Sequence, residues 1–238
     1  MTPDKIAEDI SLYQNDKGLV LTTDAYLLYC FVSKNGKNTL CELGAGSGLI
    51  SQLLLVRGKC KSAVCVDVQK DMCQRAEENA RLNNTADRCR VVHCDVKDYM
   101  PSERVDVVVS NPPYLPRNAG PENKYTEDMI CRRETTAEIA DFVKCAERCL
   151  NFGGCAYFCF TPARQSELFS AMSKAGLEPK ECIYVYPTVR HEPSLVLVRG
   201  KKGAAPGMTV RRPLIIYKDV PGKAYSDEFE LVYKEGRL

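Results

Sequence analysis

Short apolar runs alternate with amphipathic stretches along most of the chain, from about residue 39 to residue 200. The runs that have the length and the apolar content of buried strands occupy residues 38–43, 62–68, 89–96, 105–110 and 155–160. After the first run, Leu49, Leu53 and Val56 recur at helical spacing, and after the second, residues 69–84 carry charges on one helical face. Strands that alternate with helices predict βαβ units, and therefore a parallel sheet with helices on both faces.

Two further helices are expected in the second half of this region. Thr135 and Glu138 have the spacing of a capping box, which predicts the start of a helix. Gly153 and Gly154 follow the helical pattern and are expected to end it. A second helix is expected over residues 163–176.

The strands expected over residues 181–187 and 194–200 are separated by only six residues. Six residues are too few for a crossover helix, so these strands should pair in antiparallel fashion. The predicted fold class is therefore α/β, with a Rossmann-like, mostly parallel seven-stranded sheet that contains one antiparallel strand. Residues 38–200 form its core, and residues 1–37 and 201–238 are additions to it within a single domain.

The composition narrows the choice of partner and compartment. The chain has 238 residues and a net charge of +2, so a surface for nucleic acid would have to be a local basic patch. The polar N-terminus lacks the apolar core of a signal peptide, and no stretch approaches the length of a membrane span. We therefore expect a cytoplasmic protein without a membrane partner; its oligomeric state is left open.

Thirteen cysteines stand out in a chain expected to be cytoplasmic. Cys145 and Cys149 are one helical turn apart, and Cys155 and Cys159 share one face of an expected strand. Either pair has the spacing of half a metal site, but no matching half is apparent. Both pairs lie in apolar runs, which favours reduced, buried thiols and no metal.

A glycine-rich turn joins the first expected strand to the first expected helix, at Gly44, Gly46 and Gly48. Ligands of open α/β sheets bind near such a turn, at the carboxyl ends of the strands. A dinucleotide fingerprint would need a third glycine at Leu49 or Ser51, and a Walker loop would need Gly-Lys-Ser/Thr. The spacing G-x-G-x-G fits neither.

Acidic residues end three successive strands: Glu42 before the glycine turn, Asp67 after the second strand and Asp95 after the third. An acid at the position of Asp67 can accept both hydroxyls of a ribose. A nucleoside with an amino-acid tail also needs an acid near its ammonium and a polar group at its adenine. This layout favours S-adenosylmethionine as the cofactor, whereas each acid alone would be read as a solvated strand end.

The fourth strand runs into SNPPY, so that two prolines follow Asn111 directly. Prolines cannot continue a strand, and they fix the direction of the carbonyl groups around them. The Asn111 side-chain oxygen and the Pro112 carbonyl can both accept from a planar amino group, which favours its pyramidalisation for attack on a methyl group. Tyr114 can stack on a planar substrate group. A loop that merely ends a buried strand is the alternative.

The segments ELGAGSG, VDV, HCDV and SNPPY, in this order and spacing, resemble the class I methyltransferases that carry an Asn-Pro-Pro-Tyr motif. The resemblance covers about residues 38 to 200. It implies Asn111, Pro112 and Tyr114 as catalytic residues. It implies cofactor contacts from Glu42, Gly44, Gly46, Gly48, Asp67, Val68, Asp95, Val96 and Asn111.

Segments outside this core resemble the bacterial tRNA adenine N6-methyltransferases that modify the adenine beside the anticodon of a valine tRNA. Upstream, KGLVLTTDAYLLYCFV carries the resemblance, which implies that Thr23 and Asp24 cover the methionine end of the cofactor. A helix N-cap at these residues is equally compatible with the sequence. Downstream, SLVLVRGKKG and PLIIYKDVPGKAYSDEF are similar to the Gram-positive branch of this group.

The resemblance implies tRNA as the partner, and basic residues lie where they suit phosphate contacts. These residues are Arg117, Lys124, Arg132, Arg133, Arg199, Lys201, Lys202, Arg211, Arg212 and Lys218. They could equally form an ordinary solvated face. Two alternatives stay open: a protein glutamine N5-methyltransferase acting on a release factor, and a non-catalytic cofactor-binding partner subunit.

Overall fold

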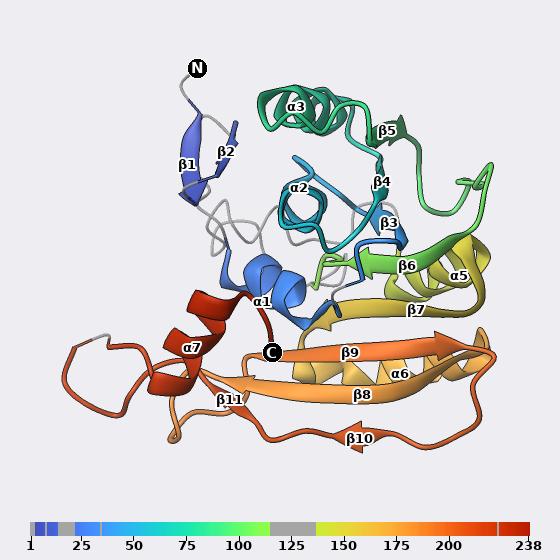
Figure 1. Ribbon diagram of the computed structural model, residues 1–238. Helices are drawn as coiled ribbons and strands as arrows, with labels where there is room; N and C mark the ends of the chain where they lie inside the picture. The colour runs from blue at the N-terminus through green and yellow to red at the C-terminus, as the bar shows by residue number, and fades with distance from the viewer. Residues whose placement is uncertain (1–2, 8, 14–21, 34, 115–136, 223) are drawn as a thin grey trace, which may run out of the picture.

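The centre of the computed structural model is one nine-stranded sheet (Figure 1). The structure describes residues 3–7, 9–13, 22–33, 35–114, 137–222 and 224–238. Along the sheet the strands follow the order β10-β8-β9-β7-β6-β3-β4-β5, and β11 also pairs with β8. The chain crosses over repeatedly between β3 and β7, as expected of βαβ units.

The seven strands expected from the apolar runs are all present. They are β3 (Thr39–Leu43), β4 (Ser62–Asp67), β5 (Cys89–His93), β6 (Val105–Ser110), β7 (Leu150–Phe160), β8 (Leu177–Tyr186) and β9 (Leu195–Lys202). Only β9 runs against its neighbours, and it pairs in antiparallel fashion with β7 and β8. The predicted fold class, with one reversed strand, is confirmed. Two short strands, β10 (Thr209–Val210) and β11 (Leu214–Ile215), extend the edge at β8.

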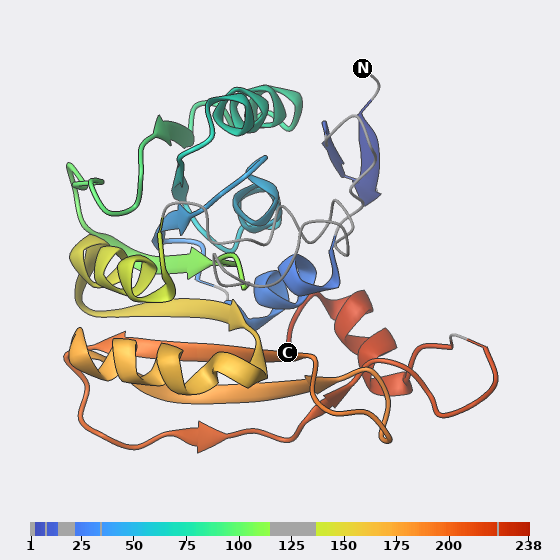
Figure 2. The same ribbon diagram turned by 180° about the vertical axis from the view of Figure 1, so that it is seen from behind.

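Helices cover both faces of the sheet. On one face lie α1 (Thr23–Phe31), α2 (Leu49–Val56) and α3 (Lys70–Leu82), which contact one another in that order. On the other face lie α5 (Ile139–Cys149) and α6 (Gln165–Lys174), which stand in front of the sheet in Figure 2. The 3-10 turn η2 (Pro162–Arg164) connects β7 to α6.

The expected end of helix α5 is wrong. α5 stops at Cys149, and β7 begins at once with Leu150, so Gly153 and Gly154 lie inside a strand. The register between β6 and β7 shifts here, and a Cβ on Gly154 would lie 3.0 Å from the carbonyl oxygen of Asp106. The glycines therefore mark an irregularity where two backbones approach closely, and not a helix stop.

The start of the same helix also differs from the expectation. Glu138 is the N-cap of α5, and its backbone N–H donates to Asp141 Oδ2 at 3.0 Å, which completes a capping box. Glu138 is thus the first residue of the box and not the fourth. Thr135, which was expected to open the helix, lies outside the described residues.

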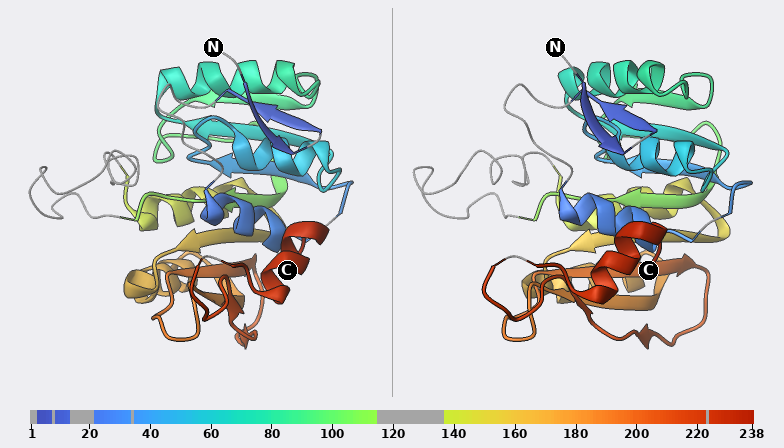
Figure 3. Two further views of the ribbon diagram at one scale, coloured as in Figure 1. Left: turned by 90° about the vertical axis from the view of Figure 1, so that its left-hand side faces the viewer. Right: turned by 60° about the vertical axis from the view of Figure 1, so that its left-hand side comes forward.

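Both terminal additions pack against the core. The hairpin of β1 (Asp4–Ala7) and β2 (Ile10–Leu12) lies beside α3 and α2. The C-terminal helix α7 (Asp227–Glu235) lies beside α1, as both views in Figure 3 show. The hydroxyl of Tyr26 on α1 donates to the carbonyl of Tyr233 on α7 at 2.8 Å.

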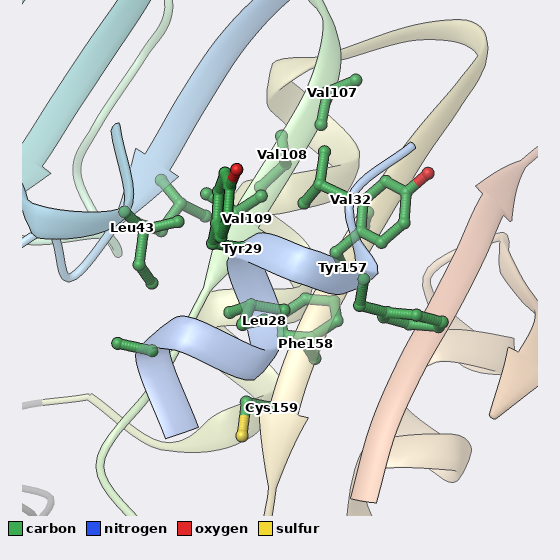
Figure 4. Packing of buried hydrophobic residues seen from close by; sticks show 14 of the residues in the cluster. Leu28, Tyr29, Val32, Leu43, Val107, Val108, Val109, Tyr157, Phe158 and Cys159 are labelled. Carbon is green, nitrogen blue, oxygen red and sulfur yellow. The ribbon is translucent and has the colours of Figure 1, made fainter. Parts of the chain in front are cut away.

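The core between α1 and the central strands is continuous (Figure 4). Leu28 and Val32 lie with the valines of β6, and Phe31 meets Tyr157 of β7 edge to face at 5.6 Å. The described cysteines all carry free thiols, and all of them except Cys94 and Cys155 are buried, where they pack as small apolar side chains. Within the described ranges, no helix has the length and apolar character that a membrane crossing needs.

Candidate active site

The glycine turn joins β3 to α2 at the carboxyl edge of the sheet. Gly44, Gly46 and Gly48 all have a positive φ, between 53° and 77°. A Cβ on Gly44 would lie 3.2 Å from the Phe142 ring, and one on Gly48 would lie 3.3 Å from Ala76. Around the Cβ position of Gly46, no described atom lies within 4 Å. The turn therefore needs glycine at all three positions, and at Gly46 it leaves room for a ligand to approach the backbone.

Glu42, which precedes this turn, binds the start of the helix that follows it. Its side chain is only 2% exposed, and Oε2 accepts from the backbone N–H of Ser51 at 2.8 Å and from the Ser51 hydroxyl at 2.5 Å. Burial raises the pKa of Glu42 to about 7, although the bonds from Ser51 act in the opposite direction. The carboxylate is thus turned toward the start of α2. Its expected place near the ammonium of the cofactor stays a prediction.

The raised pKa of Glu42 predicts how stability changes with pH. In the unfolded chain the carboxyl releases its proton near pH 4.5, whereas the folded protein holds it up to about pH 7. The wild type should therefore lose about 3 kcal/mol of unfolding free energy as the pH rises through this window. Glu42→Gln should lack this loss, and urea unfolding at a series of pH values would measure it. Parallel pH curves for the two proteins would contradict the assignment.

Asp67 ends β4 and ties the glycine turn to it. Its Oδ2 accepts from the Gly46 N–H at 2.7 Å, and its Oδ1 accepts from the Gln69 N–H at 2.8 Å. Burial raises the pKa of this carboxyl, against the lowering effect of those amide bonds. An ionised carboxylate has about four acceptor positions, so the group can still accept from hydroxyls of a ligand. Val68, the next residue, exposes 39% of its surface beside it.

Asp95 and Val96 lie in the turn that follows β5, next to Asp67 in the sheet order. Asp95 Oδ1 accepts from the Lys97 N–H at 2.9 Å, and Val96 is buried. Arg148 of α5 donates to the carbonyl of Val96 at 2.8 Å and to that of Tyr99 at 2.9 Å. Arg148 thus holds this turn in place, and the apolar pattern of α5 gave no sign of that role.

Asn79 of α3 is a second supporting residue that sequence reasoning missed. It is fully buried, and its Nδ2 donates to the carbonyl of Ser47 in the glycine turn at 2.9 Å. Its Oδ1 accepts from the N–H of Tyr13, just after the N-terminal hairpin, at 2.7 Å. One amide side chain therefore links the glycine turn to the N-terminal addition. The charged face expected for this helix gave no sign of that role.

The residues expected to be catalytic follow β6 directly. Leu43 and Ser110 are partners in adjacent parallel strands, and the Ser110 hydroxyl donates to the carbonyl of Leu43 at 2.8 Å. Asn111, the next residue, therefore leaves the sheet beside Gly44, the first residue of the glycine turn. Pro112 is buried, and Asn111 is half-buried at the edge of the sheet.

Tyr114 connects this motif to α1. Its hydroxyl lies 3.3 Å from Asp24 Oδ2 and also within hydrogen-bonding distance of Asn111 Oδ1. Thr22, and not Thr23 or Asp24, is the N-cap of α1, because its hydroxyl oxygen accepts from the Ala25 N–H. Asp24 therefore lies at the Asn-Pro-Pro-Tyr motif, whereas Thr23 is exposed in the first helical turn.

The ring of Tyr114 is only 8% exposed and meets Phe160 edge to face at 5.8 Å. Stacking of this ring on a substrate stays a prediction, and it would require the ring to be uncovered first. The basic residues expected after it, Arg117, Lys124, Arg132 and Arg133, lie outside the described residues.

The arrangement suits a nucleoside ligand and a planar acceptor. One edge of the sheet carries the backbone at Gly46, the Asp67 carboxylate and the Asp95–Val96 turn, and Asn111 follows the neighbouring strand β6 at the same edge. No group of three or more metal-ligating side chains occurs in the described part of the chain.

Comparison with protein families gives a match to the family described as methyltransferase small domain, over residues 20–160. A curated relative from Vibrio campbellii is named tRNA1(Val) (adenine(37)-N6)-methyltransferase. It is 24% identical over 229 residues, which cover 96% of this chain and 92% of the relative.

Solved structures of low sequence identity share the fold. A protein from Agrobacterium tumefaciens, described as a predicted O-methyltransferase, matches with a TM-score of 0.72 and 21% identity over 91% of this chain and 97% of its own. The geranyl diphosphate C-methyltransferase of Streptomyces coelicolor, solved with S-adenosyl-L-homocysteine, matches with a TM-score of 0.56 and 14% identity. That match covers 75% of this chain and 74% of the other.

Proposed function

The chain belongs to the methyltransferase small domain family and is an S-adenosylmethionine-dependent methyltransferase, and from this premise we propose that its acceptor is the N6 amino group of an adenine in a tRNA anticodon loop. The observation that carries the proposal is the position of Asn111, which follows Ser110, the partner in β6 of the residue before the glycine turn. The name of the full-length relative supports the same acceptor. We further propose that the chain belongs to the Gram-positive branch of that group.

The side chains at this edge can hold the cofactor. The amino-acid end of the cofactor would lie against the open backbone at Gly46. Asp67 would accept from the ribose hydroxyls. The adenine ring would lie between Val68 and the Asp95–Val96 turn. When bound, S-adenosylmethionine supplies an electrophilic methyl group on a sulfonium. Asp24 would close the site from the side of α1, through its contact with Tyr114.

The acceptor chemistry requires two oxygens with fixed directions. The lone pair of an adenine amino group is delocalised into the ring, so the nitrogen attacks only when it pyramidalises. Asn111 Oδ1 and the carbonyl of Pro112 would accept its two N–H groups and favour that geometry. In this structure the Tyr114 hydroxyl already uses Asn111 Oδ1. Because an amide oxygen has two lone pairs, the substrate would either share this oxygen with the Tyr114 hydroxyl or displace that hydroxyl.

A base within a stack cannot present its amino group to a site at a sheet edge. A loop base is among the least costly to unstack, which favours a single-stranded loop as the substrate. Glutamine N5 is the second candidate acceptor, because it too is a planar conjugated nitrogen that suits the same two oxygens.

The decisive experiment offers labelled S-adenosylmethionine with unmodified tRNA or with a release factor. Label in tRNA, recovered as N6-methyladenosine, is the expected result. Label only in a protein glutamine would replace the proposal with the second candidate. Label in neither would mean that both candidate acceptors are wrong.

Charge reversal at two arginines of the C-terminal extension tests RNA binding. Arg212 is exposed, and Arg211 forms an ion pair of 3.3 Å with Glu181. Arg211→Glu with Arg212→Glu should weaken tRNA binding. The slope of log affinity against log salt concentration should become less steep by about 1.5, because about two phosphate contacts are lost. Affinity for S-adenosylmethionine should not change.

Arg88→Glu with Arg104→Glu is a matched control. These arginines precede β5 and β6, at the opposite end of the strands, and Arg88 also has a neighbouring acid, Asp87 at 3.8 Å. The control has the same change in net charge and should keep the salt dependence of the wild type. An equal effect in both double variants would mean that overall charge alone attracts the RNA.

A further inference from the structure

Arg164 reaches the last residue of the Asn-Pro-Pro-Tyr motif from another part of the sheet. It ends the 3-10 turn η2, which follows β7. Its Nη1 donates to the backbone carbonyl of Tyr114 at 2.8 Å, across 50 residues of sequence. The side chain is only 16% exposed, so this contact is largely shielded from water.

A second group fixes the orientation of the guanidinium. Its Nε and Nη2 donate to the two carboxylate oxygens of Glu167, at 3.0 and 2.7 Å. This bidentate pair also lowers the pKa of Glu167. Because this pair holds one edge of the planar group, Nη1 has a defined direction toward Tyr114.

Phe160 joins the two sides of this arrangement. The ring is fully buried; Arg164 Cζ lies 5.5 Å from its centroid, and the Tyr114 ring meets it edge to face at 5.8 Å. The guanidinium and the tyrosine therefore pack on one rigid support at the end of β7.

We propose that Arg164 is a positioning residue that fixes the carboxyl-terminal end of the motif and thereby the directions of Asn111 Oδ1 and the Pro112 carbonyl. The amino-terminal end is already fixed, because Ser110 belongs to β6 and bonds to Leu43. Between the two ends, Pro112 and Pro113 restrict their own φ angles. The bond from Arg164 to the Tyr114 carbonyl adds a fixed backbone point at the other end of the motif. The inference rests on the proposed function only in assigning those two oxygens to the acceptor.

Arg164→Ala tests the proposal through three measurements. Turnover should fall by about 10- to 100-fold, because a displacement of about 1 Å at the acceptor oxygens is enough for such a loss. The dissociation constant for S-adenosylmethionine should change by less than about threefold, since the glycine turn and Asp67 are not in contact with Arg164. Amide hydrogen exchange in a peptide that spans residues 105–114 should accelerate by about tenfold or more.

Two variants separate positioning from general stability. Arg164→Lys keeps the charge but offers no bidentate fork, so it should restore part of the turnover. Arg81→Ala removes the surface pair with Glu77 (3.2 Å) on α3, away from the motif, and should leave all three measurements at the wild-type value.

Hydrogen exchange tests the positioning role of Arg164 independently of the proposed acceptor. If Arg164→Ala leaves exchange in residues 105–114 unchanged, the positioning role is wrong, whichever substrate is methylated. If exchange accelerates while the wild type labels a release factor and not tRNA, the positioning role stands and the proposed acceptor fails. Faster exchange with normal turnover would also overturn the proposal.

Discussion

Asn111→Ala is expected to reduce methyl transfer by about 100-fold or more, because the acceptor nitrogen would lose one of the two oxygens that we propose hold it in the attacking geometry. The affinity for S-adenosylmethionine should stay within about threefold of the wild type, since this interaction matters mainly in the transition state. Single-turnover labelling measures the first quantity and calorimetry the second. Near-normal turnover in a folded variant would remove Asn111 from the mechanism.

Pro112→Ala is the matched variant for this experiment. It keeps the carbonyl group that is expected to accept from the substrate and loses only the restriction on φ. Its turnover should therefore fall less than that of Asn111→Ala. Tyr114→Phe adds a further comparison, because it frees Asn111 Oδ1 from the tyrosine hydroxyl and keeps the ring on Phe160.

The sheet could be predicted because its strands are buried on both faces. Their apolar runs, such as residues 105–110, contrast with the polar faces of helices such as α3. Parallel pairing then brings the strand ends to one edge, so Asp67 and Asn111 could be placed near the glycine turn without coordinates.

Irregular features of the same sheet could not be predicted. A glycine pair after a helical pattern normally suggests a helix stop, and nothing local distinguishes it from a strand irregularity. Gly154 is required by the backbone of Asp106, 48 positions earlier in the chain, which only the folded sheet brings close. The two-residue strands β10 and β11 are likewise defined by their pairing with β8 and not by an apolar run of their own.

The supporting residues of the site were missed for a related reason. Asn79, Arg148 and Arg164 all donate to backbone carbonyls that are 32 or more positions away in the chain. Every residue has a backbone carbonyl, so a bond to one does not require a particular residue type and leaves no motif in the sequence. By contrast, Glu42 was singled out by its place before the glycine turn, but its burial against Ser51 depends on how α2 packs.

Asp67→Ala is expected to weaken binding of S-adenosylmethionine by about 1–3 kcal/mol, which is about 5- to 150-fold in the dissociation constant. Two effects combine in this loss. The ribose hydroxyls lose a charged acceptor, and the Gly46 N–H loses the bond of 2.7 Å that holds the glycine turn against β4. Turnover at saturating cofactor should fall less than it does in Asn111→Ala, because the acceptor oxygens are untouched.

Asp67→Asn separates the two effects on cofactor binding. The amide keeps one oxygen, which can still accept from Gly46, but it has no charge to offer the ribose hydroxyls. Its affinity should therefore lie between those of the wild type and Asp67→Ala, and the rate of hydrogen exchange in its glycine turn should equal that of the wild type. Calorimetry that finds unchanged affinity in a folded Asp67→Ala protein would remove this carboxylate from the cofactor site. Such a result would leave the role of Asn111 intact, because the two residues end different strands and act on different partners.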